Sequence, residues 1–192
     1  AGCTGFVDAL KIANNFKNPS LIVCSEFYSK NIKFFSRNLS TLFSDAASVF
    51  IFDKKKIKII ESLSGYKKNS YKELCLLKNK NIYMDGMKVF EFASTAVAPK
   101  IEKLIKKYKN KKLKKVFLHQ GSQTICNFFR RRLKSYNLTI PENIKKRGNS
   151  VSCTLPSLIK DYNKNNNFLS KEKILLCGFG VGLSFSAVVI EI

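Results

Sequence analysis

The chain has 192 residues, of which 45% are hydrophobic and 25% are charged. This composition is typical of a folded globular protein and excludes an intrinsically disordered chain. No apolar run reaches the roughly 20 residues of a membrane span, so no membrane partner is expected. The formal net charge of +22 comes largely from lysine runs, which indicate solvated basic faces that attract polyanions.

The first part of the chain predicts a helix, three strands and a loop. Apolar residues such as Phe6, Val7, Leu10 and Ile12 give one face of a helix that ends before Asn18-Pro19. The predicted elements are a helix over residues 4–17, strands over 21–25, 46–52 and 57–63, and a polar, lysine-rich loop over 64–82.

The second part alternates helices and strands. A long helical pattern starts at Gly86, and we expect Pro99 to kink or interrupt it. The predicted elements are helices over residues 86–107, 124–133 and 150–162, strands over 116–118, 174–177 and 185–192, and a loop over 163–167. This order predicts an α/β fold with a layered, mixed sheet and no linker between independent domains.

The six cysteines are far apart in the sequence and form no Cys-x-x-Cys motif, and there is only one histidine. We therefore expect neither a disulfide framework nor a zinc site, and we interpret five of the cysteines as buried apolar side chains in a reducing compartment. All six cysteines of the chain are Cys3, Cys24, Cys75, Cys126, Cys153 and Cys177.

Cys3 is the exception, because it precedes the first predicted helix. A helix start offers unpaired N–H groups and the positive end of the helix dipole, which lower the pKa of a thiol. His119 follows a predicted strand in Phe-Leu-His-Gln-Gly-Ser, and Asn149 lies in Arg-Gly-Asn-Ser. A thiol, an imidazole, an amide and the glycine turn 178–182 are the parts of a thiolate acyl-transfer site. Taken singly, a cysteine in this position is usually a packing residue and such an asparagine is usually a helix cap.

Together these segments resemble the β-ketoacyl-[acyl-carrier-protein] synthase III family of thiolase-like condensing enzymes, over essentially the whole chain. The cysteine turn resembles the family's Cys-x-Gly-Phe motif, His119-Gln120 its His-Gln pair and Gly148-Asn149-Ser150 its Gly-Asn-Thr/Ser motif. Residues 43–47 and 84–90 resemble weaker signatures of the same family.

The resemblance implies an α/β, thiolase-like layered α-β-α-β-α fold whose first half is incomplete in this chain. Residues 1–63 would be the end of the N-terminal thiolase-like half, residues 64–83 a loop excursion and residues 84–192 the C-terminal thiolase-like half. The chain starts two residues before Cys3, and the family carries further sequence upstream of that cysteine.

The resemblance also implies the site residues. Cys3, His119 and Asn149 would be catalytic, and the backbone N–H groups of Cys3 and Val181 would form the oxyanion hole. The residues implied for other roles are Arg131 and Arg132 in docking of the carrier protein, and Ser122, Phe90 and Gly121 near the pantetheine arm of the substrate. Ser122 stands where the family commonly has asparagine, which predicts a shortened or lost pantetheine contact.

The implied activity is the decarboxylating condensation of an acyl thioester with malonyl-acyl-carrier-protein, through an acyl-cysteine. We expect no permanently bound cofactor, with CoA or phosphopantetheine thioesters as substrates. The expected partners are acyl carrier protein, acyl-CoA and a second subunit in a homodimer, in the cytoplasm. Nucleic acid is disfavoured, because no recognition motif accompanies the positive charge. The alternatives are a non-decarboxylating thiolase-like acyltransferase and a non-catalytic module that binds a carrier protein.

Overall fold

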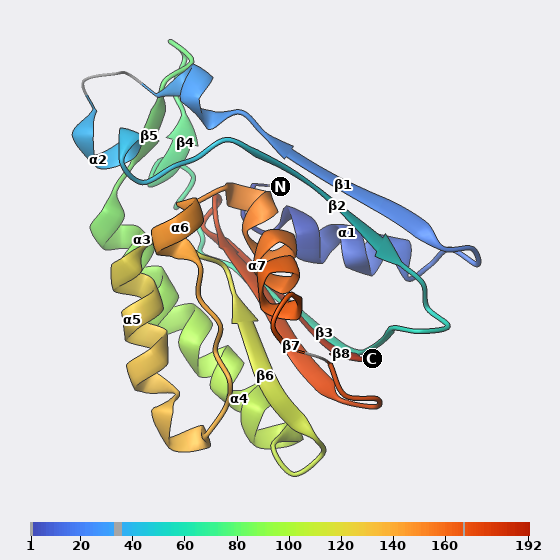
Figure 1. Ribbon diagram of the computed structural model, residues 1–192. Coiled ribbons are helices and arrows are strands. Elements are labelled where there is room, and N and C mark those ends of the chain that lie inside the picture. The colour runs from blue at the N-terminus through green and yellow to red at the C-terminus, as the bar shows by residue number, and fades with distance from the viewer. Residues whose placement is uncertain (1, 33–35, 167) are drawn as a thin grey trace.

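The computed structural model describes residues 2–32, 36–166 and 168–192. Its elements form stacked layers (Figure 1), in which a two-stranded sheet covers two helices, α1 (Gly5–Ala13) and α7 (Thr154–Asn163). These helices pack on one face of a four-stranded sheet. The opposite face is covered by helices α3 (Gly86–Phe92), α4 (Ala98–Tyr108) and α5 (Gln123–Arg132). The predicted α/β class is confirmed.

Helix α1 (Gly5–Ala13) is shorter than the predicted span of 4–17. It buries Phe6, Val7 and Leu10, whereas Ile12 is 61% exposed and does not belong to the buried face. The helix ends at Ala13 because two asparagines follow, a residue type whose side chain competes for backbone hydrogen bonds.

Strands β1 (Ser20–Glu26) and β2 (Ala46–Phe52) pair antiparallel, close to the predicted bounds. One face of this pair packs on α1 and α7 and includes Ile22 and Phe52. The other face is apolar and exposed. Its large side chains are Leu21, Val23, Val49 and Ile51, each more than 60% exposed.

The four-stranded sheet has the order β3-β8-β7-β6. Its strands are β3 (Lys58–Tyr66), β6 (Leu113–Leu118), β7 (Lys173–Gly180) and β8 (Ser184–Glu191). Strand β6 runs parallel to β7, while β3 and β7 each pair antiparallel with β8. The strands predicted over 116–118, 174–177 and 185–192 are confirmed and extend by a few residues.

Strand β3 corrects the expected division of the chain. We expected the N-terminal half to end at residue 63 and the C-terminal half to span residues 84–192. Instead β3 (Lys58–Tyr66) pairs along its length with β8 and is part of the C-terminal sheet, so the boundary at residue 63 cuts a strand. Local patterning cannot reveal this pairing, because the two strands are more than a hundred residues apart.

The segment over 64–83 is also more regular than predicted. It contains the end of β3, strand β4 (Leu74–Leu76) and the start of β5 (Ile82–Met84), and β4 and β5 form a small antiparallel hairpin. These strands have three residues each, which is too short for a clear alternating pattern.

The long helix predicted over 86–107 is present in three parts: α3 (Gly86–Phe92), a π-helical turn, η2 (Ala93–Val97), and α4 (Ala98–Tyr108). Pro99 lies in the first turn of α4, where its missing N–H is tolerated. The interruption is instead the π turn directly before Pro99, a rare element that is a recognised cause of helix kinks.

The remaining helices connect the layers. Helix α5 (Gln123–Arg132) and helix α7 (Thr154–Asn163) match the predictions, except that residues 151–153 form a separate 3₁₀ turn, η4 (Val151–Cys153). The short elements are η1 (Tyr28–Asn31), α2 (Arg37–Ser40), η3 (Lys134–Tyr136) and α6 (Ile144–Arg147). The loop predicted over 163–167 includes residue 167, which lies outside the described residues.

Two apolar cores lie on opposite faces of the four-stranded sheet. Successive residues of β6 alternate between them, with Val116 and Leu118 facing α4 and α5 and Phe117 facing α1 and α7. Because both faces are covered, the strands are almost continuously apolar. In the described part of the chain, no helix combines the length and the apolar character needed to cross a membrane.

Candidate active site

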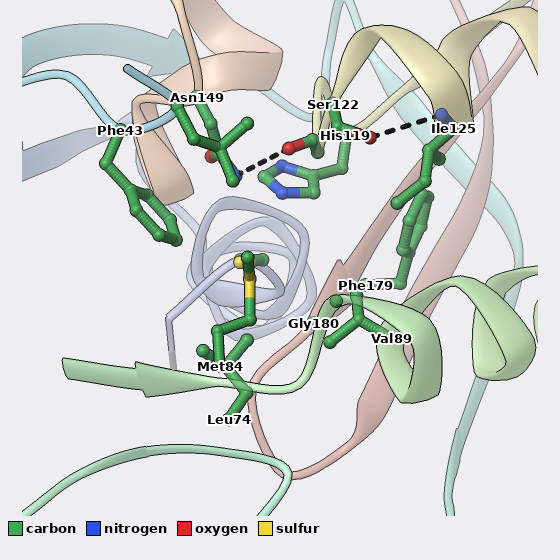
Figure 2. Close-up of a pocket in the computed structure, with 14 residues that line it drawn as sticks. Phe43, Leu74, Met84, Val89, His119, Ser122, Ile125, Asn149, Phe179 and Gly180 are labelled. Atoms are coloured by element: carbon green, nitrogen blue, oxygen red, sulfur yellow. Dashed lines mark hydrogen bonds between the residues drawn. The ribbon is translucent and has the colours of Figure 1, made fainter. Parts of the chain in front are cut away.

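A cavity of about 140 Å³ lies where α1, the end of β6 and the turn between β7 and β8 meet. The predicted catalytic residues Cys3, His119 and Asn149 all line it. In Figure 2 Phe43, Asn149, His119 and Ser122 lie along one side of the cavity, and Leu74, Met84, Val89 and Gly180 lie along the other. The fold therefore brings together three residues that are far apart in the sequence.

Cys3 lies in the turn immediately before α1 and is 5% exposed. Two glycines of β7 allow this turn to approach the strand. A Cβ atom on Gly180 would lie 2.5 Å from Sγ of Cys3, and one on Gly178 would collide with the Cys3 carbonyl oxygen. The glycine-spaced turn was predicted to supply a backbone N–H, and the N–H of Val181 in this turn lowers the pKa of the Cys3 thiol. Gly178 and Gly180 have a second role, because the absence of a side chain on each leaves room for Cys3 to pack against β7.

The expected lowering of the Cys3 pKa is not observed. Burial raises the pKa of Cys3 to about 12, and the N–H groups of Val181 and of Cys3 itself lower it only in part. Burial dominates because the turn before α1 is enclosed by β7 and shielded from water. The two N–H groups that lower the pKa are those predicted for the oxyanion hole, a role that stays a prediction.

The close approach at Gly178 leads to a stability prediction. Replacing Gly178 by alanine should lower the free energy of unfolding by about 1–3 kcal/mol, because the new methyl group meets backbone that cannot move aside easily. Gly86→Ala is the matched control, since a Cβ atom there has nothing within 4 Å. Urea unfolding of both variants measures the difference, and equal stability of the two would contradict the argument.

His119 follows β6 and is 2% exposed. Its Nδ1 lies 2.7 Å from the hydroxyl oxygen of Thr154, and its ring packs edge-on against Phe179 with centroids 5.5 Å apart. Burial lowers the pKa of His119 to about 3, so the imidazole is neutral at physiological pH. Nε2, the ring nitrogen that Thr154 does not contact, is the one available to a molecule in the cavity.

Two hydrogen bonds of the side-chain amide fix the position of Asn149. Its Oδ1 accepts a hydrogen bond from the N–H of Val151 at 3.0 Å, and its Nδ2 donates to the carbonyl oxygen of Gly121 at 3.0 Å. Nδ2 has two hydrogens, so one remains for a ligand in the cavity. Val151 has φ = +52°, an unusual conformation for a β-branched residue. In this conformation its N–H donates the hydrogen bond to Oδ1 of Asn149.

The loop around Asn149 has two further anchors that the sequence reasoning did not identify. Backbone hydrogen bonds link Asn149 with Leu42 and Ser44 on either side of Phe43. In the sequence, this contact was indicated only by the weak family signature at residues 43–47. On the other side, the Glu26 carboxylate accepts hydrogen bonds from the backbone N–H and hydroxyl of Ser152.

Ser122, Gly121 and Phe90 line neighbouring hollows: Ser122 and Gly121 line the cavity, and Ser122 and Phe90 line a surface groove. Ser122 caps α5 by accepting a hydrogen bond from Ile125 N–H, and it lines both the cavity and an adjoining surface groove. Gly121 borders the cavity. Phe90 and Thr124 line this groove and also a third hollow next to Arg131 and Arg132.

The arginines at the end of α5 differ in their contacts. Arg132 forms a two-bond pair with Glu102, at 2.8 and 3.1 Å, and Arg130 pairs with Glu142. Arg131 is exposed and, across residues 2–32, 36–166 and 168–192, has no carboxylate within 4 Å. Of the two predicted docking residues, Arg131 is thus the one whose charge is not already neutralised.

The six thiols are free. Four of the five cysteines predicted to be buried are buried, whereas Cys75 is partly exposed, and Cys3, the predicted exception, is buried as well. Among the residues that the structure describes, no group of three or more His, Cys, Asp or Glu side chains is arranged to hold a metal ion.

Comparisons with known proteins agree with this geometry. Residues 1–66 match the family model for 3-oxoacyl-[acyl-carrier-protein] synthase III, and residues 105–192 match the model for the C-terminal part of the same enzyme. The chain is 32% identical over 213 aligned residues to the β-ketoacyl-[acyl-carrier-protein] synthase III of Clostridium botulinum strain Kyoto, covering 99% of this chain. It covers 65% of that relative, slightly less than two thirds of its length.

The solved structures show the same fold. The 3-oxoacyl-[acyl-carrier-protein] synthase III of Aquifex aeolicus superimposes with a TM-score of 0.88 at 23% identity, covering 100% of this chain and 65% of the other. The Thermus thermophilus protein superimposes with a TM-score of 0.86 at 24% identity. The fold and the cavity therefore define a thiolase-like protein. Within that class, the chain belongs to the 3-oxoacyl-[acyl-carrier-protein] synthase III family.

Proposed function

We propose that the protein containing this chain condenses an acyl thioester with malonyl-acyl-carrier-protein, losing CO₂ and forming a 3-oxoacyl thioester. The observation that carries the proposal is that the Cys3 thiol, the neutral His119 imidazole and the Asn149 amide line the same cavity. Its experimental test is the release of CO₂ from malonyl-carrier protein together with acylation of Cys3.

In the first half-reaction, the Cys3 thiolate attacks the thioester carbonyl and expels the CoA or pantetheine thiolate. Since burial raises the pKa of Cys3, the thiol gives up its proton only during the attack, and the expelled CoA or pantetheine thiolate takes up that proton to leave as a thiol. The N–H groups of Cys3 and Val181 would stabilise the negative oxygen that forms during attack. The product of this step is acyl-Cys3.

In the second half-reaction, decarboxylation of the malonyl group leaves an enolate. Nε2–H of His119 and the free N–H of Asn149 would donate hydrogen bonds to its oxygen and so lower the barrier. The carbanion then attacks the acyl carbonyl on Cys3, and the Cys3 thiolate leaves. Both donors are uncharged and fixed by neighbouring groups, so little reorganisation is needed during the reaction.

We propose that the pantetheine arm of the substrate reaches Cys3 through the outer hollow, the surface groove and the cavity. The cavity and the groove share Ser122 and Ile125, and the groove and the outer hollow share Phe90 and Thr124. A narrow, partly apolar track of this kind suits an extended pantetheine arm. Arg131, at its outer end, would face the acidic carrier protein.

This assignment gives a prediction for the carrier. Arg131→Glu should raise the apparent KM for a carrier-bound substrate several-fold, because opposite charges assist docking, and the wild-type KM should rise with salt as screening shortens their reach to about 8 Å. Turnover of a small pantetheine thioester, which has no carrier surface, should hardly change. Lys55→Glu, in the turn between β2 and β3, is the matched charge-reversal control. An equal loss with both substrates would show that Arg131 supports the substrate path or the fold instead.

A homodimer working in cytoplasmic lipid biosynthesis is part of the same proposal. Support for a subunit contact comes from the apolar outer face of β1 and β2, where Leu21 and Ile51 are 65% and 67% exposed. Analytical ultracentrifugation tests the dimer, and cell fractionation tests the location. A purely monomeric protein at micromolar concentration would remove the dimer from the proposal.

The non-decarboxylating acyltransferase uses the same cysteine chemistry, and absence of CO₂ release would favour it. The non-catalytic carrier-binding module is less well supported, since binding alone does not require a thiol, an imidazole and an amide around one cavity. Failure of Cys3 to become acylated would favour the module.

A further inference from the structure

Thr154 lies behind His119, on the side away from the cavity, and is 1% exposed. It is the first residue of α7, directly after the 3₁₀ turn η4. Its hydroxyl oxygen is 2.7 Å from Nδ1 of His119 and 2.8 Å from the carbonyl oxygen of Val151. These two neighbours compete for a single hydroxyl proton.

The two arrangements give His119 opposite properties. A neutral imidazole has one ring proton, on either Nδ1 or Nε2. If Thr154 donates to the Val151 carbonyl, its oxygen must accept a proton from Nδ1, and Nε2 then presents only a lone pair to the cavity. If Thr154 donates to Nδ1, the ring proton is on Nε2, and His119 offers the cavity a hydrogen-bond donor.

The Val151 carbonyl does not need the hydroxyl proton, because it already accepts the backbone N–H of Thr154. Nδ1 of His119 has Thr154 as its one hydrogen-bond partner within the described residues. The neighbouring Asn149 also presents an N–H to the cavity, so a donor on Nε2 would give two donors converging on one ligand oxygen. The backbone of η4 is held on its far side by Glu26, which limits movement of Thr154.

We propose that Thr154 is a positioning residue that donates its hydroxyl proton to Nδ1 of His119 and thereby keeps the proton of the imidazole on Nε2. This inference rests on the proposed condensing activity, in which Nε2–H binds the enolate oxygen. Thr154 touches no substrate itself. It acts through His119, and the same short segment, residues 149–154, fixes both donors of the site.

The test uses the intact protein labelled with ¹⁵N-histidine, and the His119 signals are assigned by their loss in His119→Gln. The ¹⁵N shifts of the free enzyme should show the proton on Nε2 in the wild type and in Thr154→Ser, which keeps the hydroxyl. Thr154→Val has nearly the same shape without the hydroxyl, and its population of the other tautomer should increase. A wild-type enzyme with its proton on Nδ1 would overturn the proposal whatever its activity.

Kinetics provides the second readout. Thr154→Val should slow decarboxylation about 10- to 100-fold, as is typical when the group that orients a reacting side chain is removed, and should leave the rate of Cys3 acylation nearly unchanged. Thr154→Ser should recover most of the activity. Equal losses in the valine and serine variants, or slowed acylation in the valine variant, would indicate a packing role and contradict the proposal. If the wild type shows the Nε2 tautomer but releases no CO₂, the proposed function fails while the tautomer assignment stands.

Discussion

Cys3→Ser should abolish formation of the acyl-enzyme, with a loss of about 10³-fold or more in the rate of the first half-reaction. A serine hydroxyl is far less acidic than a thiol, and the cavity offers it little help, because His119 is neutral and the nearby Glu26 carboxylate already accepts hydrogen bonds from Ser152. Mass spectrometry of the intact protein after incubation with an acyl thioester measures the adduct, and peptide mapping locates it.

Cys75→Ser is the matched control for this experiment. Cys75 lies on β4, is partly exposed, and its thiol contacts only the carbonyl oxygen of Lys72 in the described structure. This variant should be acylated like the wild type. Acylation of a cysteine other than Cys3, or an undiminished adduct in Cys3→Ser, would remove the foundation of the proposed function.

His119→Ala and Asn149→Ala should each slow decarboxylation of the malonyl substrate by about 10²–10³-fold, the usual cost of removing one donor from a developing oxyanion. Acylation of Cys3 should stay within a few-fold of the wild-type rate, because neither side chain is needed to bind the acyl carbonyl in the first half-reaction. Release of ¹⁴CO₂ from labelled malonyl-carrier protein measures the second step, and single-turnover acylation measures the first.

One outcome would change this division of roles. If either alanine variant blocked acylation and spared decarboxylation, the residue would belong to the first half-reaction. Asn149→Asp offers a finer comparison, since it keeps the size of the side chain but replaces the N–H donor by an oxygen. It should be as slow as Asn149→Ala in decarboxylation.

The sequence was sufficient for the class of fold and for three polar residues that line the cavity. Cys3, His119 and Asn149 could be identified because each belongs to a short motif, and their order along the chain matched one family. Most helices and strands could also be placed, since their apolar periodicity is clear. The short hairpin of β4 and β5 was missed, because six residues carry too little pattern.

What sequence could not provide is the environment that distant segments create. The expected low pKa of Cys3 followed from its place before a helix, but the enclosure by Gly178 and Gly180 of β7 reverses the direction. Thr154 has no motif of its own, and only the packing of α7 against the end of β6 brings it to His119. In the same way, three neighbouring arginines look alike in sequence, and only the structure shows that Glu102 and Glu142 neutralise two of them.

The position of β8 has a consequence for how the chain folds. This strand lies between β3 and β7, although β3 precedes it by more than a hundred residues. Contacts this distant in sequence form slowly, because a long loop must close before they contribute stability. During synthesis, β3 stays without its partner until residues 184–191 have left the ribosome. An unpaired strand edge favours association with other chains, so the nascent chain is exposed to aggregation until β8 emerges and pairs with β3.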